Sequence, residues 1–130
     1  MSAYTDVRTF LIQNGLAASS MTSDWAVVVG GVTDHLTQPH LAIIPTTGRR
    51  PLDVMGRDPL HQPNFRIVVQ GAPGGYVEAE AKANSIWNAL HRQQFADFLT
   101  VEGTNPPIWL GYDEDQQKPR WSLNFTTIRK

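Results

Sequence analysis

The chain has 130 residues, of which 41% are hydrophobic and 18% charged, and its formal net charge is -1. This length can bury a real core, so we expect residues 1–130 to form a single domain, and the composition argues against global disorder. The near-neutral charge argues against a dedicated nucleic-acid binder, which would carry a basic excess. The lack of cysteine excludes disulfides and thiolate chemistry and fits assembly in a reducing cytoplasm.

The first residues predict a short helix. An apolar stripe runs from Tyr4 to Leu11, Ser2 can cap it, and Gly15 can end it. The opening decapeptide lacks the basic and apolar regions of a signal peptide. No apolar run approaches the roughly 20 residues of a membrane span.

Two strands and a long loop are expected next. Residues 25–29 form a continuous apolar run, as in a strand buried on both faces. Residues 41–47 follow as a second strand, in which Pro45 indicates an edge or a bulge. Residues 46–62 contain two prolines and two glycines without a usable period, so we expect a long loop there.

The segment from residue 63 to residue 92 predicts a strand, a tight turn and a long amphipathic helix. Residues 64–70 alternate between apolar and more polar side chains, with the two-residue period of a half-buried strand. The turn GAPGG stops it. From Tyr76 onward, apolar residues recur at steps of three and four along one stripe. Ala79 and Ala83 keep this stripe thin, so the helix can lie close to a sheet.

Residues 98–102, 107–112 and 120–128 predict three more strands, the last two joined by a polar hairpin loop at residues 113–119. The fold class is therefore α+β. We expect a mainly antiparallel sheet with the long amphipathic helix and the short N-terminal helix packed on one face, and a long loop over residues 46–62.

No catalytic, cofactor or metal site is evident, and we do not expect an enzyme. The four histidines, which show no paired ligand spacing, are His35, His40, His61 and His91. No serine has a nucleophile-elbow motif, and the glycine turn lacks both the P-loop lysine and the dinucleotide-binding spacing. The four tryptophans are expected in the core, although one or two could anchor an interface.

The basic loop allows three interpretations. Arg49, Arg50 and Arg57 cluster there with Met55 and Leu60. The loop is either a solvated surface segment or an assembly arm that orders against a neighbouring protein. Phosphate contact by the arginines is a third interpretation, which the near-neutral charge of the chain disfavours.

Three stretches together resemble the minor capsid or tail-terminator proteins of long-tailed bacteriophages. They are HLAIIPTTGRRP, then HQPNFRIVVQGAPGGYVEAEAKANSIWNALH, then PPIWLGYDEDQQKPRWSLNFTTIRK. The matching features are a Thr-Gly turn, a Pro-x-Phe-x-Ile-x-Val strand and a Tyr-x-x-Ala helix start at Tyr76. A Leu-Gly-x-Asp turn at residues 110–113 and an Asn-Phe strand at residues 124–125 complete the set. The order of these motifs over residues 25–130 carries the resemblance.

The resemblance implies a structural protein of the virion. Such proteins form a ring, commonly a hexamer, that caps the tail tube, stops its polymerisation and offers a docking surface to the head connector or head-completion protein. DNA passes through the lumen without specific binding. Assembly takes place in the cytoplasm of the bacterial host, and no membrane or cofactor is involved.

Subunit contacts are expected on two oppositely charged segments, because complementary charge sets register and specificity between neighbours. These residues are Arg49, Arg50, Met55 and Arg57 in the long loop, and Asp113, Glu114, Asp115 and Lys118 in the hairpin. The alternatives are a head-completion or neck protein of the same junction and, from a different class, a small α+β ligand-binding domain or enzyme with a pocket beside the GAPGG turn.

Overall fold

The computed structural model describes residues 3–20, 24–30, 38–46, 49–52, 60–112 and 117–129, and for residues 49–52, 60 and 61 it describes the backbone alone. The elements in chain order are α1 (Ala3–Gln13), β1 (Ala26–Val29), β2 (His40–Pro45), β3 (Arg49–Leu52), β4 (Leu60–Gln62), β5 (Phe65–Gln70), α2 (Tyr76–Leu90), β6 (Phe98–Gly103), β7 (Ile108–Tyr112) and β8 (Pro119–Arg129). Within these residues β1 and β2 are parallel, and every other strand pair is antiparallel. The predicted α+β class with a mainly antiparallel sheet is confirmed.

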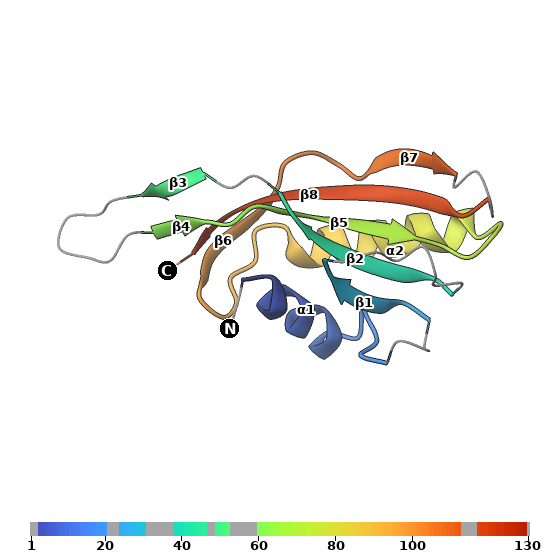
Figure 1. Ribbon diagram of the computed structural model, residues 1–130, viewed down its shortest axis with the longest axis horizontal. Coiled ribbons are helices and arrows are strands. Elements are labelled where there is room, and N and C mark those ends of the chain that lie inside the picture. The colour runs from blue at the N-terminus through green and yellow to red at the C-terminus, as the bar shows by residue number, and fades with distance from the viewer. Residues whose placement is uncertain are drawn as a thin grey trace.

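The 11-residue strand β8 is the axis of the sheet (Figure 1). Trp121 pairs with Val69 of β5 on one side and with Trp109 of β7 on the other. Arg129, at the far end, pairs with β4 on one side and with β6 on the other. The strand order is therefore β1-β2-β5-β8-β7 at one end of the molecule and β3-β4-β8-β6 at the other.

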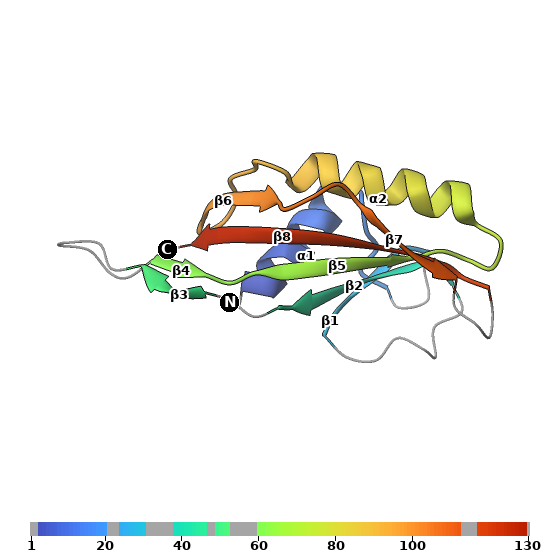
Figure 2. The same ribbon diagram turned by 90° about the horizontal axis from the view of Figure 1, so that it is seen from above.

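Both helices lie on the same face of the sheet, as predicted (Figure 2). One apolar core fills the space between them and the strands, and it includes Val7 and Leu11 of α1, Ile86 of α2 and Leu123 of β8. Burying each such side chain fully contributes about 1.5–3 kcal/mol. The core thus joins the two helices to one sheet face.

The predicted strand–turn–helix unit is confirmed with nearly the same bounds. Phe65 and the alternate residues after it on β5 are buried, as the two-residue period requires. Ala79 and Ala83 are fully buried, which lets α2 lie close to the sheet. Gly71 is needed at the turn, because a Cβ on it would lie 2.9 Å from the Cβ of Ala79 and 3.0 Å from a ring carbon of Pro119. The turn is a site of close packing.

The expectation of a structureless loop over residues 46–62 is wrong in part. Residues 49–52 and 60–62 are the antiparallel strands β3 and β4, and β4 continues onto β8 through the pair His61–Arg129. The short β3 has no period of its own, and its conformation depends on pairing. Figures 1 and 2 show β3 and β4 as an arm beyond the ends of the helices. Pro45 is the last residue of β2 and pairs with Phe65 of β5, whereas the described pairing of β2 with β1 ends at Ile43, so Pro45 lies beyond that pairing.

Candidate interaction surface

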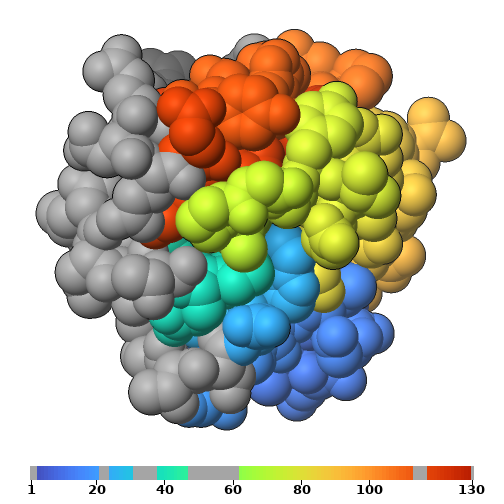
Figure 3. All heavy atoms as spheres, turned by 90° about the vertical axis from the view of Figure 1, so that its right-hand side faces the viewer, coloured from blue at the N-terminus to red at the C-terminus, as the bar shows by residue number. Residues whose placement is uncertain are grey.

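Four aromatic side chains gather where α2 begins beside β7 and β8. Tyr76 packs edge-on against Trp109 at 5.1 Å between ring centroids, and it lies 6.0 Å from Trp121. Trp109 also contacts Trp121 at 5.2 Å and Tyr112 at 5.1 Å. Figure 3 looks onto this end of the molecule, where the start of α2 in yellow-green borders the orange-red strands. We call Tyr76, Trp109, Tyr112 and Trp121 the aromatic cluster.

The strand β7 is apolar and exposed over most of its length. Ile108, Trp109, Leu110 and Tyr112 are between 38% and 46% exposed. The register of β7 against β8 shifts between Trp109 and Gly111, which is a β-bulge. Gly111 has a φ of 95°, a conformation that other residues rarely adopt. The bulge changes the direction of the β7 backbone between Leu110 and Tyr112. Both side chains remain exposed.

One acidic group of α2 borders the aromatic cluster. Tyr76 hydrogen bonds to Glu80, one helical turn further on, and this bond is the main cause that raises the pKa of Tyr76 above its ordinary value of 10.0. Desolvation and the negative charge of Glu80 act in the same direction. Glu78 is also exposed near the start of α2, but it lines a hollow with Trp25 and Pro39 on the other flank of the helix. The surface therefore combines exposed aromatic rings with the carboxylate of Glu80.

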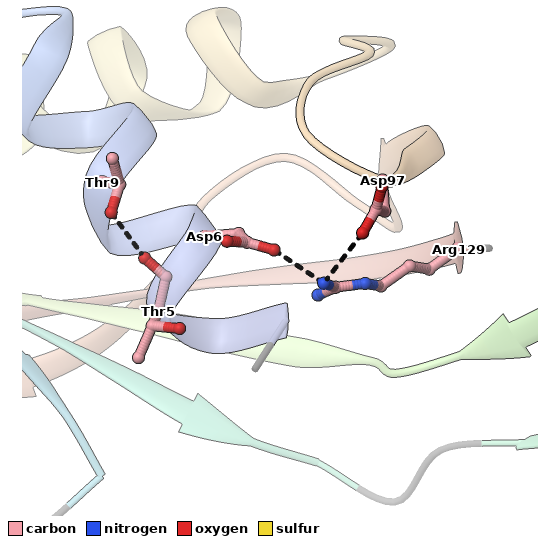
Figure 4. A network of polar contacts seen from close by, with 5 residues as sticks. All are labelled: Thr5, Asp6, Thr9, Asp97 and Arg129. Atoms are coloured by element: carbon pink, nitrogen blue, oxygen red, sulfur yellow. Dashed lines mark hydrogen bonds and ion pairs between the residues drawn. The ribbon is translucent and has the colours of Figure 1, made fainter. Parts of the chain in front are cut away.

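At the opposite end of β8, an ion network fixes the base of the arm (Figure 4). Arg129 Nη2 lies 2.7 Å from Asp6 Oδ2 of α1 and 3.6 Å from Asp97 Oδ2, in the segment before β6. The Arg129 and Asp6 side chains are only 12% and 10% exposed, whereas Asp97 is 66% exposed. Because Arg129 also pairs with His61 of β4, this network joins α1, β8 and the start of the arm.

Most of the site residues predicted from the sequence cannot be placed. Arg49 and Arg50 lie in β3, with only their backbone described. Met55, Arg57, Asp113, Glu114 and Asp115 lie outside the described residues. Lys118 is placed: its side chain is 1% exposed, so it is not presented at the surface as a hairpin-tip residue would be. The interface role of these residues stays a prediction.

The sequence pattern does not single out β7. Trp109 is expected in the core by default, whereas in the structure that residue is 39% exposed. A signal was present, because residues 108–110 are three consecutive large apolar residues in a strand otherwise expected to alternate. Such a run fits a doubly buried strand as well as an exposed edge, so only the fold distinguishes the two.

The described part of the chain offers few side chains for metal binding or catalysis. Its residues contain no cluster of three or more histidine, cysteine, aspartate or glutamate side chains that could hold a metal ion. A hollow of about 420 Å³ lies beside the GAPGG turn, and Trp25, Pro39, Gly75 and Glu78 are among its lining residues. None of the helices described here is long and apolar enough to cross a membrane.

The fold has a solved counterpart in a particle that transfers genes. A chain in the virion of the native gene transfer agent (GTA) particle superimposes with a TM-score of 0.71 at 18% sequence identity. The match covers 98% of this chain and 94% of that chain. No family model matches the sequence, and no curated protein matches it either. At this identity the likeness shows the fold, and it extends over essentially the whole chain.

Proposed function

We propose that this protein is a structural virion protein of a phage-like head–tail junction: a ring-forming tail terminator. The observation that carries the proposal is the full-length likeness of the fold to a virion chain, with 98% of this chain covered at a TM-score of 0.71. The finer assignment as a tail terminator rests on the motif order in residues 25–130, which resembles that family.

In the proposed assembly, subunits associate head to tail around an axis, commonly as a hexamer. A contact between two different surfaces closes into a ring when its rotation divides a full turn. One face of the ring caps the tail tube and stops its polymerisation, and the other face docks the head connector or head-completion protein. The net charge of -1 suits a lumen through which DNA passes without being held. The protein then acts by shape and contact without catalysis.

Two other functions remain in competition. A head-completion or neck protein of the same junction would share the fold and the ring. A small ligand-binding domain or enzyme is favoured by one observation, the hollow of about 420 Å³ beside the GAPGG turn. No histidine lines that hollow among the described residues, and its carboxylates belong to Asp24 and Glu78.

The decisive experiment adds the purified protein to growing tail tubes of the same particle. A terminator arrests tube elongation and appears as an extra ring at one tube end in negative-stain micrographs. A neck protein leaves elongation unchanged but binds the head connector. The proposal is wrong if the tubes grow unchanged and stay uncapped. If a ligand also raises the melting temperature of the protein, the protein is a ligand-binding domain.

A further inference from the structure

The outer edges of the sheet differ in how they are closed. On β1, Ala18 covers the edge: its N–H donates to the Trp25 carbonyl at 2.9 Å, and its carbonyl accepts from the Val27 N–H at 3.3 Å. On β6, the Arg92 N–H donates to the Val101 carbonyl at 2.6 Å. Each of these two edges is thereby bridged at one position by another part of the same chain.

The edge of β7 is open. Within the described residues, no backbone hydrogen bond to residues 108–112 is found outside the ladder with β8. The alternate N–H and C=O groups that point away from β8 can therefore pair with another strand. Proteins usually protect such edges with charge, proline or a covering segment, yet β7 is IWLGY. An exposed apolar edge of this kind is a binding surface for an extended segment.

We propose that the outer edge of β7, together with the aromatic cluster, binds strand β3 of a second copy of this chain. The inference rests on the proposed ring and assigns its subunit contact. Charge complementarity identifies the occupant. Glu80 hydrogen bonds to Tyr76 of the aromatic cluster, and the sequence continues from β7 into Asp113-Glu114-Asp115. The sequence of β3 is Arg-Arg-Pro-Leu, which supplies two cations and an apolar residue to that acidic, apolar surface.

Hydrogen bonding argues against pairing of β3 with itself. Pro51 deprives β3 of one N–H, so a pair of two β3 strands lacks two donors. The strand β7 contains no proline, so a pair of β3 with β7 lacks only one donor. Pairing of β7 with itself is disfavoured by charge, because it would bring the acidic groups of two copies together.

The placement of the two strands makes the contact intermolecular and repeating. The arm joins β8 at Arg129, and β7 joins it at residues 119–122, at the opposite end and on the opposite side. At about 3.3 Å per residue, the seven to ten steps of β8 between residues 119–122 and Arg129 separate the two sites by roughly 23–33 Å. A contact between different surfaces of neighbouring copies generates a ring or a filament, as the proposed function requires.

Cysteine cross-linking tests the contact directly, because the chain has no cysteine of its own. Leu110→Cys and Arg50→Cys are made singly and together and are treated with a short bismaleimide at the concentration used for imaging. The proposal expects a ladder of multimers from the double variant, dimers from a mixture of the two single variants, and monomers from each single variant alone.

Three other results overturn the contact, and a fourth separates the contact from the ring. Dimers of Leu110→Cys alone would mean that β7 pairs with β7. A link from Leu110→Cys to tail-tube protein, in place of a second copy, would make the tube the occupant. Closed rings without any link from residue 110 to residue 50 would refute this contact and leave the proposed function standing. Ladders without closed rings would support the contact and refute the ring.

A substitution pair adds a quantitative check. Leu110→Lys places a charge on the open edge and is expected to weaken association about tenfold or more, which corresponds to about 1.4 kcal/mol. Val77→Lys is the matched control for an added charge, because Val77 is 74% exposed and belongs to α2 and not to the paired edge of β7. Equal association of the two variants would contradict the proposal.

Discussion

The ring of Tyr76, the first residue of α2, meets the ring of Trp109 in β7 edge-on, with the centroids 5.1 Å apart and the planes at 69°. This geometry is the one that aromatic quadrupoles favour. It joins the start of the helix to the edge strand β7, whose ladder in the described part of the chain is formed with β8. The GAPGG turn, by setting where α2 begins, therefore also sets the position of the exposed aromatic surface.

The Tyr76 hydroxyl should report on its bond to Glu80. Because that bond is the main cause of the raised pKa, Glu80→Gln should lower the pKa of Tyr76 toward 10.0. The phenolate absorbance, measured against pH in the folded protein, follows this directly. In the wild type, the folded-state pKa is above the unfolded value. The stabilisation that protonated Tyr76 gains from Glu80 is therefore complete below the unfolded-state pKa of 10.0. It is lost as the pH rises through the folded-state pKa of Tyr76.

The control for that titration is Glu78→Gln, which removes a carboxylate from the same turns of the helix. Glu78 is not among the groups that shift the pKa of Tyr76. An equal shift in both variants would show that general negative charge, and not the hydrogen bond, determines the titration of Tyr76.

The two aspartates around Arg129 should contribute very differently to stability. Asp6→Asn breaks a 2.7 Å pair between side chains that are 10% and 12% exposed, and we expect a loss of about 2 kcal/mol in the free energy of unfolding. Asp97→Asn removes a 3.6 Å contact to a carboxylate that is 66% exposed, and we expect a loss below about 0.5 kcal/mol. Urea unfolding of the two variants measures both values, and similar losses would contradict the assignment of Asp6 as the main partner.

Local period and turn chemistry explain why part of the fold was predictable. The alternation in residues 64–70 and the three- and four-residue steps after Tyr76 are properties of short segments, and both elements have nearly the expected bounds. The strands β3 and β4 were not predicted, because residues 49–52 and 60–62 have no period. They become strands by pairing with each other and, at His61, with β8, which lies far along the chain.

The candidate site was less predictable than the fold. The apolar sequence of residues 108–112 fits a strand in the core and a strand at an edge equally well. Its edge position follows from the pairing of β8, which has β5 on one side and β7 on the other. Lys118 shows the converse: it belongs to a polar hairpin sequence, yet the packed side chain is 1% exposed. Exposure depends on tertiary contacts that composition does not encode.

The close approach at the turn predicts a specific pair of substitutions. Gly71→Ala brings a Cβ within 2.9 Å of the Ala79 Cβ, and we expect a loss of about 1–3 kcal/mol in stability from overpacking. Adding Ala79→Gly removes that clash at a cost of about 1 kcal/mol of helix propensity. The double variant should therefore lose less stability than the sum of the two single losses, as a thermodynamic cycle would measure. Strict additivity would place the strain elsewhere, at Pro119 or at the Gly75 carbonyl.

The bulge in β7 provides a prediction that links backbone conformation to assembly. Gly111 has a φ of 95° and no heavy atom within 4 Å of the position that a Cβ would take, so Gly111→Ala is penalised by conformation and not by crowding. We expect a loss of about 1 kcal/mol, faster amide hydrogen exchange in β7, and weaker association of subunits.

Gly30 supplies the matched control for this conformational penalty. It has a φ of 65° and equally open surroundings, but it follows β1, on the other edge of the sheet. Gly30→Ala should therefore cost a similar free energy of unfolding while leaving exchange in β7 and subunit association unchanged. If both alanine variants weaken association equally, the effect comes from general destabilisation. If only Gly111→Ala does so, the bulge geometry itself presents the β7 edge to its partner.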